Sequence, residues 1–265
     1  MHCFYGFYAR IRMFFDNFAK ENMLSSVNVI VLRAFMFGDT KMMVDVLSRE
    51  EGRMSCVLKT GSSKKGKSRR QIFQPLSQLE LTLERKAPGQ LATIKDAHIN
   101  TAFRSVQFDP YKLSITMFLA EMLCSVTKSE QSSPTLFDYI SDSIQWLDNA
   151  DAGFSNFHLV FLMRLTKFIG FFPNTEDYAE GYCFDMENGC FVPFATSEHG
   201  FLNAEETKKM HALMRMNYST MHLFRMSHTE RNRCLDVIME FYALHVPNFR
   251  ELKSIKILRE IFSPI

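Results

Sequence analysis

The sequence has 265 residues, 46% hydrophobic and 23% charged, which allows two ordinary domains with a buried core and excludes a disordered chain. The formal net charge is +2, but residues 23–100 carry 13 Lys and Arg against 7 Asp and Glu (net +6), whereas residues 101–265 carry 15 against 20 (net −5). Unless this asymmetry is a chance scatter of surface charge, it predicts that the first part meets an anionic polymer.

Residues 1–22 are rich in aromatic side chains and are interrupted by five charged residues: Arg10, Arg12, Asp16, Lys20 and Glu21. This pattern fits neither a secretory signal nor a membrane anchor. A second methionine, Met23, precedes the first clean strand pattern. We therefore predict that Met23 is the natural start and that residues 1–22 are a leader, either an extension or a loosely attached helix.

The next segment, residues 23–102, predicts a domain of five short strands, at 27–32, 42–47, 54–58, 76–83 and 91–99. In the fourth of these, Leu79, Leu81 and Leu83 alternate with polar residues, which is typical of a strand with one buried face. Turn residues such as Gly38, Gly52 and Gly61 separate the predicted strands. Five short strands at this spacing predict a small closed or nearly closed barrel.

From residue 103 onward the hydrophobic period becomes helical. Asp109 and Pro110 supply an N-cap and a first-turn proline, and Asn203 and Ser227 each precede a glutamate by three positions. The predicted helices cover residues 110–127, 134–147, 155–170, 203–217, 227–245 and 253–262. Residues 173–202 form an irregular insertion for which a hairpin is one interpretation. The predicted fold class is α+β, with a β-barrel domain followed by an α-helical domain at 103–265.

The strongest local feature is the basic loop at residues 59–70, which lies between two predicted strands. Six of its twelve residues are cations and two are glycines; the cations are Lys59, Lys64, Lys65, Lys67, Arg69 and Arg70. Such a loop can follow a phosphate backbone, because Gly and Ser allow close approach while Lys and Arg neutralise phosphates. We predict that it binds nucleic acid. The alternative is a solvated loop that only maintains solubility.

The same loop contains Gly61 to Ser68, which satisfies the nucleotide-binding pattern G-x-x-x-x-G-K-[ST]. A working phosphate loop must open a long helix. Here only six residues separate Ser68 from Pro75, after which strand alternation resumes, so nucleotide hydrolysis is retained only as an alternative function.

Arg33, Phe35 and Phe37 follow the first predicted strand. If they lie on the barrel surface, a phenylalanine can stack on a base while Arg33 pairs with a phosphate. Packing of both phenylalanines in the core is the favoured prediction.

Cys183, Cys190 and His199 are the metal-ligand candidates, but they lack the paired C-x-x-C spacing and the fourth ligand of structural zinc. We predict two packed thiols and a surface histidine, hence no metal and no cofactor. The spacing of Ser, His and Asp residues gives no catalytic grouping, so we predict a non-enzymatic protein. Six scattered cysteines without a secretory signal, and no uncharged run of 18 apolar residues, predict a cytoplasmic protein without a membrane segment.

Several stretches resemble, in order and spacing, the bacterial RecO recombination-mediator family. Residues 31–53 resemble its first hairpin, Lys59-Thr60-Gly61-Ser62-Ser63-Lys64-Lys65 its basic loop, and Gln74-Pro75-Leu76 the step that follows. Residues 161–173, with Gly170 and Pro173, resemble the end of a family helix. Residues 242–254 resemble the family's C-terminal motif. The resemblance covers roughly residues 23–262.

The resemblance implies an OB-fold barrel and a helical domain. It also implies binding to single- and double-stranded DNA, strand annealing, and replacement of single-strand-binding protein by recombinase together with the partner RecR, at the bacterial nucleoid. Many members carry a four-cysteine zinc site and bind the acidic tail of single-strand-binding protein through the helical domain. Only Cys183 and Cys190 remain here, so we expect the variety without zinc. A scaffold that acts through its helical domain alone is the other alternative.

Overall fold

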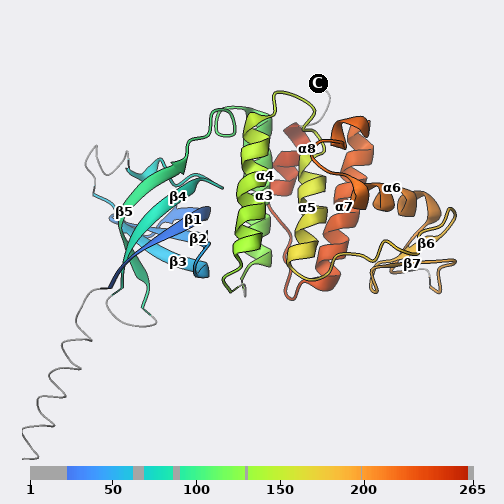
Figure 1. The fold of residues 1–265 in the computed structure, drawn as a ribbon, viewed down its shortest axis with the longest axis horizontal. Helices are drawn as coiled ribbons and strands as arrows, with labels where there is room; N and C mark the ends of the chain where they lie inside the picture. Colours follow the sequence, from blue (N-terminus) through green and yellow to red (C-terminus); the bar gives the residue numbers. More distant parts are fainter. Residues whose placement is uncertain (1–22, 62–68, 86–89, 129–130, 198, 262–265) are drawn as a thin grey trace, which may run out of the picture. The chain divides into compact units, whose positions relative to one another are not determined.

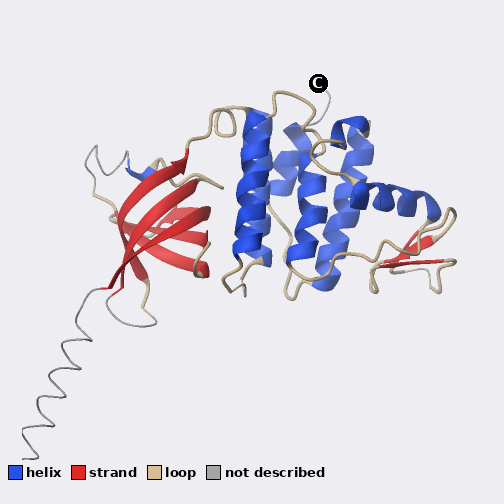
Figure 2. Cartoon of the chain, in the orientation of Figure 1, coloured by secondary structure: helices blue, strands red, loops and turns tan. Residues whose placement is uncertain are grey.

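The structure is a computed structural model in which residues 23–61, 69–85, 90–128, 131–197 and 199–261 are described. The chain divides into two compact units, one containing the residues up to Ala102 with the short segment 130–133, the other containing the rest (Figure 1). Figure 2 shows long strands in the first unit and mainly helices in the second. The predicted α+β fold class is confirmed, and the predicted leader lies outside the described residues.

The first unit is a closed five-stranded barrel with strand order β1-β2-β3-β5-β4. Its strands are β1 (Met23–Met36), β2 (Lys41–Ser48), β3 (Gly52–Lys59), β4 (Gln78–Arg85) and β5 (Ala92–Thr101). The 14-residue β1 closes the barrel because it pairs with both β2 and β4, and β3 pairs with β5 in parallel. This arrangement is the OB-fold.

The barrel core is built from alternate residues of the strands, as their patterns predict. Leu79, Leu81 and Leu83 of β4 are at most 1% exposed and pack with Val29 of β1 and Cys56 of β3. Burial raises the pKa of the Cys56 thiol to about 12, so this cysteine behaves as a small apolar side chain. Of the polar alternates of β4, Glu80 is exposed, whereas Gln78 at the start of the strand is buried.

A β-bulge interrupts the long first strand. Val31 pairs with Val46 and Arg33 with Asp45, so two residues of β1 oppose one of β2. Because successive side chains of a strand point to opposite faces, the extra residue reverses the alternation. The inward series that includes Val31 therefore continues at Ala34, and Arg33 and Phe35 turn to the outer face.

Gly52, at the start of β3, has a φ of +75°, and a Cβ there would lie 2.5 Å from the backbone carbon of Gln131. We predict that Gly52→Ala lowers the free energy of unfolding by about 1–3 kcal/mol from the positive φ alone, with a further loss from the backbone clash. Urea unfolding measures this change. Gly38→Ala is the matched control, because Gly38 has a φ of +67° with nothing within 4 Å of the added Cβ. Equal losses in the two variants would contradict the prediction.

The second unit consists of helices and a small sheet. Its helices are α3 (Pro110–Val126), α4 (Pro134–Asn149), α5 (Phe157–Phe168), α6 (Ala204–Arg215), the 3₁₀ helix η1 (Met221–Leu223), α7 (His228–His245) and α8 (Ser254–Ile261). The sheet has the order β7-β6-β8, with β6 (Cys183–Asp185), β7 (Cys190–Val192) and β8 (Phe201–Leu202). All six predicted α-helices are present with ends shifted by at most three residues; β8 and η1 were not predicted.

The predicted caps explain where helices begin. Asp109 accepts hydrogen bonds from the first-turn amides of α3, and Ser227 and Glu230 form a complete capping box on α7. Asn203 caps α6. The α5 prediction was early by two residues. Asn156 at the N-cap makes no capping bond, because its side-chain oxygen accepts from Arg231 Nε and its amide donates to carbonyls of η1 and its C-cap.

The helix α5 lies at the centre of the second unit. Nine of its residues are buried, and the buried Tyr242 of α7 donates its hydroxyl to the Leu162 carbonyl at 2.8 Å. The helix is buried over most of its length, as expected for a core helix, and only Lys167 and Phe168 at its C-terminal end are exposed. Among the described residues, no helix combines the length and the apolar character needed to cross a membrane.

Candidate nucleic-acid interface

The outer face of β1, β2 and β3 presents three rows of side chains that run across the strands. Pairing aligns Lys41 with Lys59 in one row, Phe35 with Met43 and Val57 in the next, and Arg33 with Asp45 and Ser55 in the third. Their neighbours along the strands, such as Val44 and Leu58, point into the core. We call these eight positions of the outer face, listed by row, the strand face: Lys41, Lys59; Phe35, Met43, Val57; Arg33, Asp45, Ser55.

Arg33 is held against the strand face by an acid. Its Nε and Nη2 donate to Asp45 Oδ2 at 3.0 and 2.7 Å, and its guanidinium lies 4.9 Å from the Phe35 ring centroid. The Arg33 side chain is nevertheless 60% exposed, so it remains accessible to a phosphate. Arg33 thus lies on the barrel surface, and its contact with phosphate stays a prediction.

Asp45 is the acidic residue at the centre of this row. Burial by itself raises the pKa of its carboxyl, but hydrogen bonds from Ser55 and Arg33 and the charge of Arg53 bring the pKa below the usual value. The Asp45 carboxylate therefore stays charged at neutral pH and offsets the nearby cations.

Lys41 and Lys59 stand opposite each other at the end of the strand face, and both are exposed. Neither forms an ion pair with any residue that the structure describes. Like charges placed directly opposite each other in a sheet repel, and a bound anion relieves that repulsion. This lysine pair is therefore a favourable place for a phosphate.

The described ends of the basic loop lie against the barrel. Arg70 Nη1 is 3.5 Å from the sulfur of Met36, at the end of β1, and Arg69 forms an ion pair with Asp96 at 3.6 Å and donates to the Lys95 carbonyl. Lys59 is the last residue of β3. The predicted residues Lys64, Lys65 and Lys67 lie outside the described residues.

The chain that follows the loop does not provide the helix that a nucleotide-binding phosphate loop needs. Only Arg69 and Arg70 are helical in the described chain after the loop; a turn then leads to Pro75 and to β4. No helix begins between Arg70 and β4, so in the described chain the long helix that a phosphate loop ending at Ser68 must open does not follow.

The prediction that Phe35 and Phe37 pack in the core is wrong. Phe35 is 41% exposed and Phe37 is 64% exposed. The bulge at Val31/Arg33 turns both rings outward, because it reverses the inward alternation that Val27, Val29 and Val31 begin.

The metal candidates are on or beside the hairpin of β6 and β7. Cys183 pairs with Val192 and Cys190 with Asp185, and His199 is exposed. Burial, followed by the charge of Asp185, raises the pKa of the Cys190 thiol, which disfavours the thiolate that zinc requires. Among the described residues, no group of three or more His, Cys, Asp or Glu side chains is placed to hold a metal ion.

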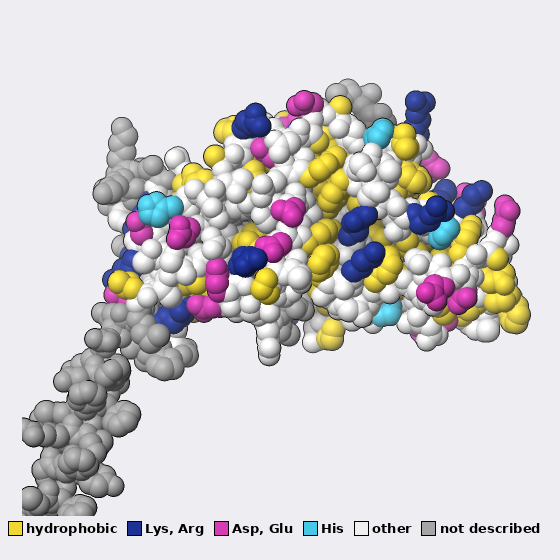
Figure 3. Space-filling view, viewed as in Figure 1, with side chains coloured by type: hydrophobic (Ala, Val, Ile, Leu, Met, Phe, Trp, Pro, Cys, Tyr) yellow, Lys and Arg dark blue, Asp and Glu magenta, His cyan; other side chains and the backbone are white. Residues whose placement is uncertain are grey.

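The helical unit has a groove of about 350 Å³ between α6 and α7, here called the α6–α7 groove. Most of its lining surface is apolar, and Lys208 and Arg225 in the lining are exposed. The apolar lining residues are Ala212, Phe224, Met226 and Cys234, and the other charged ones are Glu205, Lys209 and Glu230. On the face drawn in Figure 3, Lys and Arg side chains border apolar ones in the area where Figure 1 labels α6 and α7.

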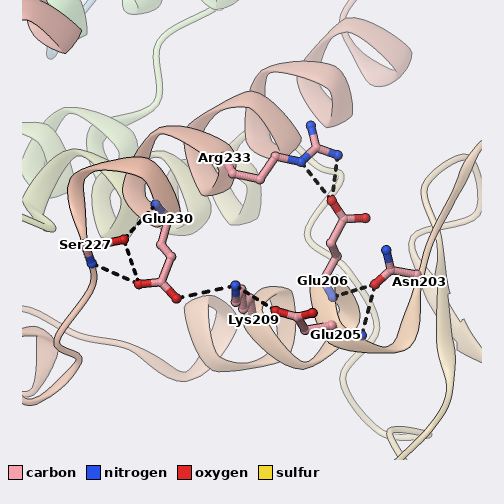
Figure 4. A network of polar contacts seen from close by, with 7 residues as sticks. All are labelled: Asn203, Glu205, Glu206, Lys209, Ser227, Glu230 and Arg233. Carbon is pink, nitrogen blue, oxygen red and sulfur yellow. Dashed lines mark hydrogen bonds and ion pairs between the residues drawn. The ribbon is translucent and has the colours of Figure 1, made fainter.

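A polar network joins the two helices beside this groove (Figure 4). Lys209 of α6 lies 3.2 Å from Glu205 and 3.5 Å from Glu230 of α7. Arg233 of α7 donates from Nε to Glu206 Oε1 at 2.8 Å. Glu205 and Glu230 share the single cation Lys209, so with Lys208 and Arg225 the groove lining carries three cations against two acids.

Sequence reasoning missed Lys41, Met43 and Val57 of the strand face, and it missed the α6–α7 groove. A signal for Lys41 was present: counting outward from the turn that ends at Gly52 aligns it with Lys59. The groove had no comparable signal, because its lining comes from separate segments of the chain.

Both units match known protein families. Residues 23–103 match the family "Recombination protein O N terminal" and residues 107–254 match "Recombination protein O C terminal". The chain is 47% identical over 241 residues to the DNA repair protein RecO of Phocaeicola vulgatus and 41% identical over 241 residues to that of Bacteroides fragilis. It is 33% identical over 245 residues to the RecO of Porphyromonas gingivalis. Each alignment covers 91% of this chain and 100% of the relative, and the chain therefore belongs to the RecO family of DNA repair proteins.

Proposed function

We propose that this protein is a non-catalytic recombination mediator that binds single- and double-stranded DNA through the barrel. In this proposal the basic loop and the strand face hold backbone phosphates without reading sequence. The protein then anneals complementary strands and, with RecR, helps load recombinase onto DNA covered by single-strand-binding protein. It acts in the cytoplasm, at the nucleoid.

The observation that carries this proposal is the run of cations along one part of the barrel. Lys41 and Lys59 stand opposite each other without a described acidic partner, and the six-cation loop starts at Lys59. The face of an OB-fold formed by strands 2 and 3 commonly binds oligonucleotides. Concentrating two strands on such a surface and screening their mutual repulsion favours pairing.

The first test is a fluorescence-anisotropy titration of the full chain with a short labelled single strand at several salt concentrations. If five loop cations contact phosphates, the logarithm of the affinity should fall with the logarithm of salt at a slope near roughly −3.5, about −0.7 per contact. The base sequence of the labelled strand should have little effect on its affinity. Absence of binding at low salt would contradict the proposal and favour the scaffold alternative. Nucleotide binding that needs magnesium and is lost in Lys67→Ala would favour the nucleotide-binding alternative.

Replacement of Asp45 is predicted to strengthen DNA binding. Replacing Asp45 by Asn removes the charge that neutralises Arg33, so we expect the salt slope to steepen by about 0.7 and single-strand affinity at 0.1 M salt to rise about fivefold. The same titration measures both. Asp39→Asn, an exposed acid in the turn after β1, is the control for a general change of net charge. A weaker or unchanged affinity in Asp45→Asn, relative to Asp39→Asn, would contradict a phosphate role for Arg33.

We further propose that the α6–α7 groove holds the acidic tail of single-strand-binding protein. An apolar lining next to Lys208 and Arg225 suits a peptide that combines carboxylates with apolar side chains. The variant with both Lys208→Glu and Arg225→Glu should bind a labelled synthetic tail peptide at least about tenfold more weakly, since each lost charge contact is worth about a factor of several. Lys167→Glu, an exposed cation on α5, is the control. Equal binding by all forms would place the peptide elsewhere.

A further inference from the structure

The middle row of the strand face is apolar although it lies between charged rows. Phe35, Met43 and Val57 occupy adjacent positions on three neighbouring strands. Phe35 is 41% exposed, and Met43 and Val57 are both partly exposed. Side chains that face each other across neighbouring strands lie about 5 Å apart, so the row forms a continuous apolar strip.

Phe37, which follows the end of β1, stands opposite Lys41 of the lysine row and brings a second exposed ring beside this strip. It lies two positions after Phe35, so both rings leave the same side of the chain. The backbone amide of Phe37 donates to the Lys41 carbonyl at 2.8 Å, which fixes the position from which the 64% exposed ring projects. Exposed phenylalanines on a rigid strand cost solvation free energy unless a ligand covers them.

The two outer rows supply charges on either side of the strip. Lys41 and Lys59 lie on one side and Arg33 on the other, each row about 7 Å from the strip along the strands. A single strand presents both phosphates and the flat faces of its bases. A duplex presents phosphates but buries those faces in its own stack. Cations alone therefore attract both forms, whereas the apolar strip contacts only unpaired bases.

We propose that Phe35 and Phe37 stack on unpaired bases, and that this contact makes the barrel prefer single-stranded DNA to duplex. The inference rests on the DNA binding proposed above and adds its selectivity. The Phe35 ring also supports the Arg33 guanidinium, so Phe37 is the cleaner residue for a test.

The test compares the full chain with Phe37→Ala in titrations of a labelled single strand and of the matching duplex. Loss of one stacked base should weaken single-strand binding roughly tenfold or more, while duplex binding changes less than about twofold. The salt slope should stay the same, because no ionic contact is removed. Leu24→Ala, an exposed apolar residue at the start of the same strand, should leave both affinities unchanged.

Two further substitutions separate stacking from general apolar contact. Phe37→Trp should retain single-strand affinity and show indole quenching when the strand binds, whereas Phe37→Leu should be nearly as weak as Phe37→Ala. Unchanged single-strand binding in Phe37→Ala, or an equal loss on duplex, would overturn the inference. If the wild-type protein binds neither form at low salt, the DNA-binding proposal itself fails. If it binds both forms with a steep salt dependence, the DNA-binding proposal stands, and the Phe37 variants test the stacking inference alone.

Discussion

Replacing the five cations Lys64, Lys65, Lys67, Arg69 and Arg70 by Gln should lower single-strand affinity roughly 10³-fold at 0.1 M salt. Five phosphate contacts at about 0.7 each give a log–log salt slope of about −3.5. At this slope, lowering salt tenfold from 1 M to 0.1 M raises affinity by about 3.5 powers of ten, and a variant without the five contacts loses that increase. The variant should keep only the weaker binding, with a shallower salt slope, that the cations of the strand face provide. Anisotropy titration across the salt range measures affinity and slope together.

The matched control carries the same change of net charge at another place. Lys128, Lys167, Arg215, Arg250 and Lys256 are exposed cations of the helical unit, and their replacement by Gln also removes five charges. We expect this control to keep most of the wild-type slope. Equal losses in the two variants would mean that net charge, and not the basic loop, governs binding.

Single substitutions should show how much each loop cation contributes to the salt slope. Arg69 is already paired with Asp96, so a phosphate must compete with that acid. Arg69→Gln should therefore reduce the slope less than Lys64→Gln does. The reverse order would show that the pair with Asp96 opens at no cost when DNA binds.

Local patterns were sufficient to predict the five barrel strands and the six α-helices. The alternation of Leu79, Leu81 and Leu83 predicts a strand with one buried face, and all three are buried. The pairs Asp109-Pro110 and Ser227–Glu230 mark the starts of α3 and α7, because a cap is a contact within a few residues of the chain. Such features depend on neighbours in sequence, and sequence alone reveals them.

The arrangement of the strand face could not be predicted in the same way. One extra residue in β1 decides whether Phe35 faces the core or the solvent, and the residues around Val31 carry no glycine or proline that would mark a bulge. The acid that holds Arg33 is 12 positions away, on β2. The α6–α7 groove depends on how two helices pack, which no local pattern determines.

The second large effect concerns the stability of the helical unit in mild acid. His158, in the first turn of α5, is 2% exposed, and burial together with the charge of Arg231 lowers its pKa from 6.5 to about 3. Because the folded-state pKa is the lower one, the unfolded chain binds the proton first. The free energy of unfolding contributed by this neutral histidine is therefore complete above pH 6.5 and falls as the pH drops towards 3.

At 1.36 kcal/mol per pH unit the whole loss amounts to about 5 kcal/mol, of which about 2 kcal/mol falls between pH 6.5 and 5. That upper window lies above the ordinary pKa values of 3.8 and 4.5 for Asp and Glu, so their protonation contributes little to it. Urea unfolding at pH 7 and pH 5 should show a loss in the wild-type protein that is smaller by about 2 kcal/mol in His158→Gln, which cannot take up the proton. His199→Gln changes an exposed histidine and should keep the wild-type loss. A loss of the same size in His158→Gln would mean that His158 can be protonated inside the folded protein, and that its surroundings open enough in mild acid to admit water.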